Sequence, residues 1–169
     1  HHPVPETALV LAPNITDFPE IPPLGENLLV KLAAVLHDEV TTTDELIPSG
    51  ETSSYRSNPL RLAEFTLSRR EPDYVNRAKA AAALEAQRLS GTPSPLLLAL
   101  LRRVGDADSL IKTTQFGSVI YANRPGDGSA REQAASCQRI LGGCANLCQE
   151  FSTKRYRSNC INWGILPFT

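Results

Sequence analysis

The chain has 169 residues, of which 41% are hydrophobic and 21% are charged, a composition typical of one globular domain large enough to bury a core. The formal net charge is −1, and neither a basic excess that would favour nucleic-acid binding nor a long acidic block is present. The longest apolar run, Leu96 to Leu101, is far shorter than the roughly 20 residues that span a membrane.

The N-terminal residues differ in composition from the rest. His1 and His2 resemble the remnant of an affinity tag, and because the sequence contains no methionine we interpret the chain as a fragment of a longer protein. Residues 3–24 hold six of the 13 prolines and are predicted to form an extended lead-in or linker that lies on a neighbour. Residues 25–169 are predicted to form one domain.

The first half of that domain is predicted to hold a strand and two helices. Residues 27–36 are apolar with little alternation, which favours a buried strand, although periodicity alone leaves a helix open. Residues 37–58 are polar and rich in turn formers, as in a functional or disordered surface loop. Residues 73–90 are alanine-rich and strongly helical, and prolines open a second short helix over 95–103.

The second half is predicted to alternate strands and helices. Its expected elements are a strand at 116–122, a tight loop at 123–129, a helix at 130–141, a strand at 144–151, a short helix at 157–164 and a closing segment at 165–168. A strand, a glycine-rich loop, a helix and a second strand form a βαβ pattern, which predicts an α/β fold with a partly parallel sheet.

The loop and the start of the helix that follows it carry the strongest chemical signal. Gly126 and Gly128 let the backbone turn sharply and approach a ligand, and a helix that begins at Ser129 would point its N–H groups at an anion. Arg131 adds a planar cation suited to a carboxylate, so that the Ser129 hydroxyl could act as a base. Ser129 and Glu132 also fit a capping box, and the structural and functional readings are compatible.

Three segments in order then resemble motifs of the aconitase family. Gly-Asp-Gly-Ser-Ala-Arg-Glu-Gln-Ala-Ala, followed by Arg-Ile-Leu-Gly-Gly from Arg139, is similar to the family's G-x-G-S-S-R-E-H-A-A and R-x-L-G-G. Glu39 to Gly50 resembles N-I-S-T-D-H-I-x-P-A-G, and Asn162 to Phe168 resembles K-x-G-x-L-P. The three motifs span about residues 28–168, so the resemblance covers the predicted domain.

The resemblance assigns roles to four residues. Ser129 matches the family's catalytic serine, whose alkoxide removes a proton from a hydroxy acid, and Arg131 matches the arginine that binds a substrate carboxylate and stabilises that alkoxide. Asp44 matches an active-site carboxylate, although an aspartate after three threonines could instead start a turn or cap a helix. Arg56 stands twelve residues after Asp44, where the family has a substrate-binding arginine.

The resemblance also implies a fold, a reaction and partners. It implies the swivelling β/β/α domain of the aconitase superfamily, one part of a cytoplasmic hydro-lyase that dehydrates and rehydrates a hydroxy polycarboxylic acid. The [4Fe–4S] cluster of such an enzyme needs spaced cysteine thiolates, and this chain has no C-x-x-C pair. We therefore expect the cluster in companion domains of the same enzyme or in a large subunit, no cofactor or metal in this chain, and no activity of the chain alone.

Departures from the family pattern leave alternatives open. The second serine of the pair is Ala130 and the histidine after the glutamate is Gln133, which puts citrate in doubt as the substrate. The chain could also be the stand-alone small subunit of an isopropylmalate-isomerase-type enzyme, or a binding module that keeps the anion site without chemistry. Four cysteines in the last third are expected to be reduced and buried, and the basic residues at 154–157 to lie on the surface, where they could contact an anion.

Overall fold

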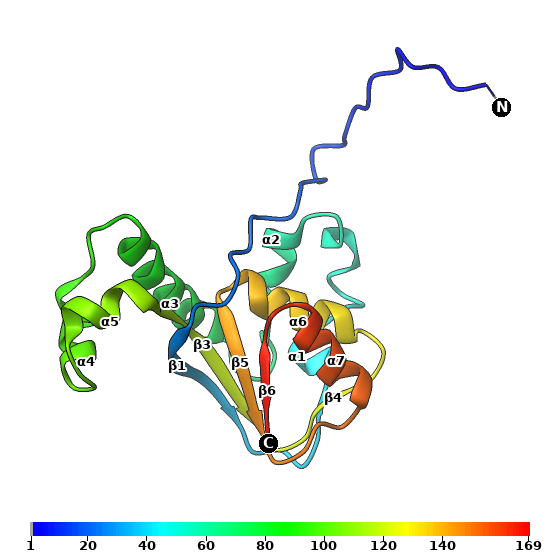
Figure 1. Cartoon of the computed structure of the whole chain (residues 1–169). Helices are drawn as coiled ribbons and strands as arrows, with labels where there is room; N and C mark the ends of the chain where they lie inside the picture. Colours follow the sequence, from blue (N-terminus) through cyan, green and yellow to red (C-terminus); the bar gives the residue numbers. More distant parts are fainter. Residues whose placement is uncertain (1) are drawn as a thin grey trace.

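The computed structural model describes residues 2–169 and contains a parallel sheet flanked by helices (Figure 1). Its strands run in the order β1 (Asn27–Leu36), β3 (Thr114–Ala122), β5 (Gly143–Cys148) and β6 (Leu166–Phe168), and every neighbouring pair is parallel. A second, two-stranded parallel sheet joins β2 (Thr41–Thr42) to β4 (Pro125–Asp127). The predicted α/β class with a parallel sheet is confirmed, and the arrangement is compatible with a swivel-like domain.

The predicted strands and the two predicted helices of the first half, one long and one short, are confirmed. The helices are α1 (Thr43–Leu46), the 3-10 turn η1 (Ser53–Tyr55), α2 (Pro59–Ala63), α3 (Tyr74–Leu89), α4 (Pro95–Arg102), α5 (Ala107–Thr113), α6 (Arg131–Ile140) and α7 (Lys154–Asn162). The sequence analysis did not predict the short helices α2 and α5. Their five and seven residues form too few helical turns to show a hydrophobic periodicity.

The segment 37–58 is more ordered than predicted, because it contains β2, α1 and η1. The Thr42 side chain accepts from Glu45 N at 3.2 Å, while Glu45 Oε2 accepts from Thr42 N at 2.8 Å. This capping box fixes the start of α1 and leaves the Asp44 carboxylate free for other contacts.

The capping box predicted at Ser129 and Glu132 is wrong. Helix α6 begins at Arg131 with Ala130 at its N-cap, and no side chain caps it. Ser129 therefore stands one residue before the capping position, so its hydroxyl is not used to close the helix end. Helix α7 also begins three residues earlier than predicted, because Thr153 Oγ1 accepts from Tyr156 N at 3.1 Å and caps it there.

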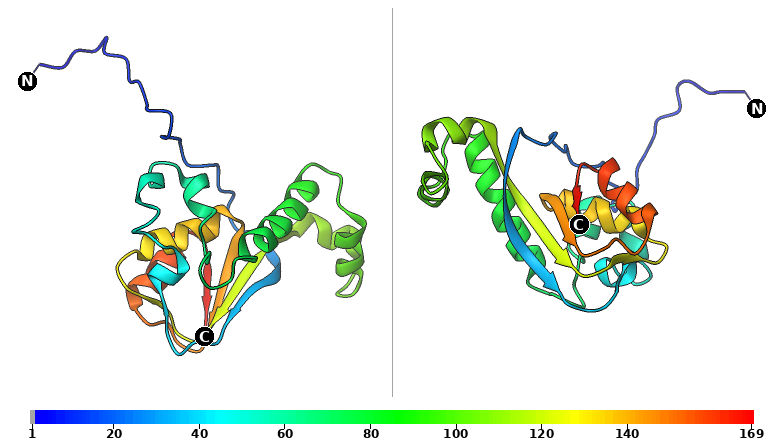
Figure 2. Two further views of the ribbon diagram at one scale, coloured as in Figure 1. Left: turned by 180° about the vertical axis from the view of Figure 1, so that it is seen from behind. Right: turned by 60° about the horizontal axis from the view of Figure 1, so that its bottom comes forward.

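The helices cover one face of the main sheet. On this face, Ala34 and Ile120 belong to the hydrophobic core that includes residues of α3 and α6. Asn146, the strand neighbour of Ile120, donates a hydrogen bond from Nδ2 to the Tyr156 hydroxyl of α7. The strand register places a row on the opposite face whose side chains stay partly exposed: Val35 (39%), Tyr121, Leu147 (38%) and Phe168 (49%). One face of this parallel sheet is therefore apolar and incompletely covered by residues 2–169, and Figure 2 shows the sheet from two further sides.

The lead-in runs away from the domain at its start and is fastened to it nearer its end (Figure 1). Thr16 N donates to Ser57 O at 2.9 Å, and the Phe18 ring stacks on Trp163 with ring centroids 5.4 Å apart. Pro22 O accepts from Arg139 Nη2 at 2.6 Å. Residues 2–26 contain no helix or strand, and His1 lies outside the described residues, so its interpretation as part of a tag stays a prediction.

Candidate functional site

The glycine loop is held between two neighbouring elements. Gly126 and Gly128 have φ values of 96° and 121°, which residues other than glycine rarely adopt. A Cβ on Gly126 would lie within 3.0 Å of the Tyr156 ring, and one on Gly128 would lie equally close to Thr43 Oγ1. Each glycine thus allows the loop to pack, one against α7 and the other against α1, and the anion-binding role of the loop stays a prediction.

A surface hollow of about 330 Å³ opens at the end of this loop. We call it the Ser129 hollow, and it is lined by Ser129, Arg131, Glu132, Lys154, Arg155, Ser158 and Asn159. Ser129 is exposed and its hydroxyl has no hydrogen-bond partner among residues 2–169. Arg131 is half-buried, and its Nε is shielded from solvent without a partner in the described chain. The structure therefore brings Ser129 and Arg131 together, with a free hydroxyl beside a guanidinium group.

The Ser129 hollow carries an excess of positive charge. Three of its residues are cations, Arg131, Lys154 and Arg155, and one is an acid, Glu132. Within residues 2–169, none of the three cations has a carboxylate oxygen within 4 Å, whereas most of the arginines on α2 to α3 are paired with carboxylates. Helices α6 and α7 both begin at this hollow, which adds the partial positive charge of their N-termini. The arrangement favours an anion.

Lys154 and Arg155 are the site residues that the motifs did not identify. In the sequence they stand 25 or more positions after Ser129, and they form part of a basic cluster that gives no sign of its spatial neighbours. The cap at Thr153 orients α7 so that Lys154, Arg155, Ser158 and Asn159 share the face that lines the hollow, while Arg157 is not part of it.

Arg56 lies in a separate, adjoining hollow of about 230 Å³. This Arg56 hollow shares Glu132 with the Ser129 hollow and also includes Gln133, Ser136, Cys137 and the stacked rings of Phe18 and Trp163. The Arg56 side chain is exposed, and its Nη2 donates to Ser49 O at 3.4 Å. The two predicted substrate-binding arginines, Arg131 and Arg56, thus line separate hollows that share Glu132 of α6.

Asp44 lines neither hollow. Its Oδ2 lies 2.7 Å from Arg69 Nη1, and Arg69 also pairs with Glu51. Helix α1, which carries Asp44, packs against α6 and β4, so its backbone is close to the glycine loop while its carboxylate is engaged elsewhere. A catalytic role of Asp44 stays a prediction. It requires either that the ion pair between Asp44 and Arg69 breaks or that this ion pair is itself part of the active site.

The residues of this chain do not fit an iron–sulfur cluster. No group of three or more His, Cys, Asp or Glu side chains within residues 2–169 is arranged to hold a metal ion. All four cysteines are buried free thiols, as predicted. Burial raises the pKa of the Cys137 thiol to about 12 and those of Cys148 and Cys160 to about 11, which keeps them protonated rather than as the thiolates that bind iron. In the same residues, no helix has the length and apolar character needed to cross a membrane.

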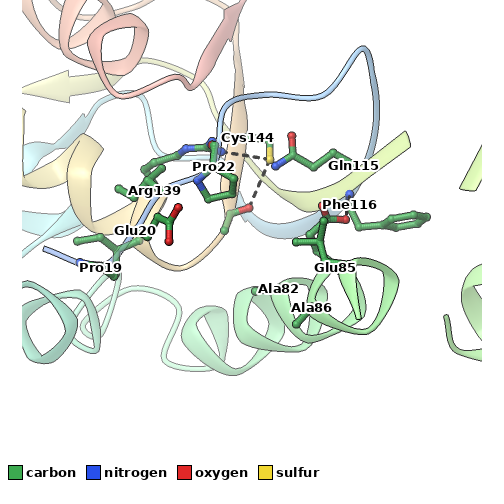
Figure 3. A pocket seen from close by; sticks show the side chains of 14 residues that line it. Pro19, Glu20, Pro22, Ala82, Glu85, Ala86, Gln115, Phe116, Arg139 and Cys144 are labelled. Carbon is green, nitrogen blue, oxygen red and sulfur yellow. Dashed lines mark hydrogen bonds between the residues drawn. The ribbon is translucent and has the colours of Figure 1, made fainter. Parts of the chain in front are cut away.

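A third hollow, of about 200 Å³, lies under the end of the lead-in. It contains the buried Arg139 guanidinium and Cys144, and Figure 3 shows the hydrogen bond between them, with Pro22 alongside. Arg139 Nη1 donates to Gly143 O at 3.2 Å and Nη2 to Pro22 O. Because these partners are backbone carbonyls and a buried thiol, we assign Arg139 to fastening the lead-in onto the turn between α6 and β5.

Comparisons with known proteins give a partial match. No protein-family model matches the chain. A stretch of 65 residues, 38% of this chain, is 38% identical to aconitate hydratase A of Bradyrhizobium diazoefficiens. The stretch covers only 7% of that relative, so the chain corresponds to a small part of its length. This sequence is therefore similar to an aconitate hydratase over part of its length.

Proposed function

We propose that this chain is the swivel domain of an aconitase-like hydro-lyase and supplies the serine base and carboxylate-binding arginines. The Ser129 hollow carries the proposal: an unbonded serine hydroxyl and a half-buried guanidinium group face the same cationic surface. The partial likeness to aconitate hydratase A supports the same reaction class. The substrate would be a hydroxy polycarboxylic acid.

In this proposal the cations of the Ser129 hollow bind the substrate, which gives up a proton, and stabilise the Ser129 oxygen, which accepts that proton. Arg131 binds a substrate carboxylate with two parallel hydrogen bonds and, with Lys154 and Arg155, lowers the free energy of a negatively charged Ser129 oxygen. That oxygen takes a proton from the carbon beside a carboxylate. The electron pair of the C–H bond becomes the C=C bond while the C–O bond breaks, and the leaving hydroxide takes a proton from solvent to form water. The Ser129 hydroxyl then releases its proton to solvent, which restores the base. Arg56 holds a further carboxylate from the adjoining hollow.

The proposal includes companion domains that carry the [4Fe–4S] cluster. The thiols of this chain do not fit the cluster, so its ligands would belong to those domains or to a large subunit, and the chain alone would be inactive. The incompletely covered face of the main sheet supports a neighbour, because parallel sheets are normally buried on both faces. A cytoplasmic location belongs to the same proposal.

A binding module without chemistry is the second candidate. Ala130 stands where the family has its second serine, which removes one hydroxyl from the site, and Asp44 is paired with Arg69 outside both hollows. A cationic hollow of this kind could bind a polycarboxylate and leave it unchanged.

Turnover by the full-length parent protein separates the two candidates. The parent would be reconstituted with iron and sulfide and assayed with a panel of hydroxy acids, with formation of the C=C bond followed by absorbance. We expect turnover of at least one acid and a loss in kcat of about 10²- to 10⁴-fold in Ser129→Ala, because the base is removed. Ser109→Ala, on the distant helix α5, is the matched control and should keep full activity.

Two results would contradict the hydro-lyase proposal. One is a reconstituted parent that binds these acids without converting any of them, which would favour the binding module. The other is a Ser129→Ala variant whose kcat equals that of the Ser109→Ala control, which would show that Ser129 is not the base.

A further inference from the structure

An apolar pocket lies between α3, α4 and the first half of β1, and Figure 1 shows these elements at one side of the molecule and α7 at the other. Its volume is about 510 Å³, within the range of about 300–1,000 Å³ that is typical of small-molecule sites. It adjoins the amino ends of β1 and β3, whereas the glycine loop follows the carboxyl end of β3. The pocket shares no lining residue with the Ser129 hollow or the Arg56 hollow.

Alanines on α3 keep this pocket open. Ala80 and Ala81 line it with single methyl groups, where longer side chains would fill the space between the helix and β1. Leu84 lies one turn further along α3, and Leu96 and Leu100 line the pocket from α4. The Leu96 side chain is 58% exposed, so the apolar lining is only partly shielded from water. A ligand that covers this lining would gain free energy from its burial.

One lysine is the charged group of this pocket. The strand register sets Leu29 opposite Phe116, and Lys31 follows two positions along β1, so its side chain leaves the sheet on the same side as theirs. Lys31 is exposed and has no carboxylate oxygen within 4 Å among residues 2–169, whereas Lys79 on α3 pairs with Glu64. No acidic side chain of the described chain lines the pocket, so the Lys31 charge is not neutralised there.

We propose that this pocket binds a free fatty acid, with the alkyl chain between α3, α4 and β1 and the carboxylate at Lys31. The apolar walls favour an alkyl chain because its burial removes it from water. The unpaired cation favours a ligand whose polar end is negatively charged over one whose polar end is neutral. The site goes beyond the proposed function, because α3 and α4 carry none of the three motifs that resemble the aconitase family.

Octanoate and 1-octanol are suitable probes, because they share one chain length and differ only at the polar end. Each would be titrated at low ionic strength into the ¹⁵N-labelled 169-residue chain, below the concentration at which the probe aggregates. Dissociation constants would be taken from the amide shifts of Leu29, Leu84 and Leu100. We expect saturable binding of both probes, with the largest shifts at residues that line the pocket.

Filling the pocket should weaken the binding of both probes. In Ala80→Leu the longer side chain takes up part of the pocket, and we expect both affinities to fall about tenfold because part of the alkyl chain is displaced into water. Ala80 is exposed, so the variant should fold. Ala83→Leu is the matched control, because it makes the same change at an exposed position of α3 that does not line the pocket, and it should keep both affinities.

Removing the cation should affect only the acid. We expect Lys31→Gln to weaken the binding of octanoate roughly two- to fivefold, the effect of one exposed ion pair, and to leave the binding of 1-octanol unchanged. Lys112→Gln is the matched control, because Lys112 is an exposed lysine on α5 that does not line the pocket. It should keep the affinity for octanoate.

Four results would overturn the fatty-acid site. They are amide shifts that do not include the pocket, equal affinities in Ala80→Leu and Ala83→Leu, and a Lys31→Gln variant that binds octanoate as tightly as the Lys112→Gln control. The fourth is a set of pocket shifts that change with protein concentration before any probe is added, which would show that a second copy of the chain covers the pocket. None of these results bears on the hydro-lyase proposal, which is tested by turnover of the reconstituted parent.

Discussion

Replacing Gly128 with alanine should destabilise the domain and disturb the loop that carries Ser129. The residue has φ +121°, where a residue with a Cβ costs about 1–3 kcal/mol. The new methyl group would also lie within 3.0 Å of Thr43 Oγ1, and relieving such an overlap costs about 1–3 kcal/mol. The reduced freedom of the unfolded chain returns about 0.4–1 kcal/mol. We expect a net loss of about 1–5 kcal/mol in the free energy of unfolding, measured by urea denaturation.

Gly50→Ala is the control for this substitution. Gly50 has no heavy atom within 4 Å of an added Cβ and no positive φ, so its replacement should change the stability by less than about 0.5 kcal/mol. Combining Gly128→Ala with Thr43→Ala removes the overlap but keeps the backbone strain, and should cost less than the sum of the two single changes. If Gly128→Ala were as stable as Gly50→Ala, the packing of the glycine loop on α1 would be wrong.

Three further perturbations test the core and the lead-in. Tyr156→Phe removes the buried hydroxyl that accepts from two side-chain amides and should cost about 2 kcal/mol by urea denaturation, whereas Tyr55→Phe, whose hydroxyl has no partner in the described residues, should cost little; equal losses would contradict this role. Arg139→Met should free the lead-in and speed its cleavage in limited proteolysis, and an unchanged cleavage rate would count against the fastening role. Stability should be unaffected by thiol ionisation below the unfolded-chain pKa of about 9 and should fall as pH rises from about 9 towards 11–12, by about 1.4 kcal/mol per pH unit for each thiol, because the unfolded chain releases these protons first. A flat alkaline profile would contradict the raised pKa values of Cys137, Cys148 and Cys160.

Much of the fold could be predicted because its signals are local. The apolar run at 27–36 and the alanine-rich segment at 73–90 became β1 and α3 within one residue of the predicted ends. The βαβ pattern around the glycine loop indicated parallel strands, and β3 and β5 are parallel. In each case the backbone preference and the burial pattern of one short segment agree, and no distant contact is needed to decide between alternatives.

The sequence by itself determined which residue types are present for carboxylate chemistry and which segments carry them, but not how they meet. The pattern of a hydroxyl residue followed three positions later by glutamate occurs at Thr42 and at Ser129, and only the packing of the glycine loop on α1 and α7 decided that the first caps a helix and the second does not. The same packing placed Lys154 and Arg155 beside Ser129 and left Asp44 paired with Arg69. Such choices depend on contacts between residues 25 or more positions apart, whose energies local sequence patterns do not contain.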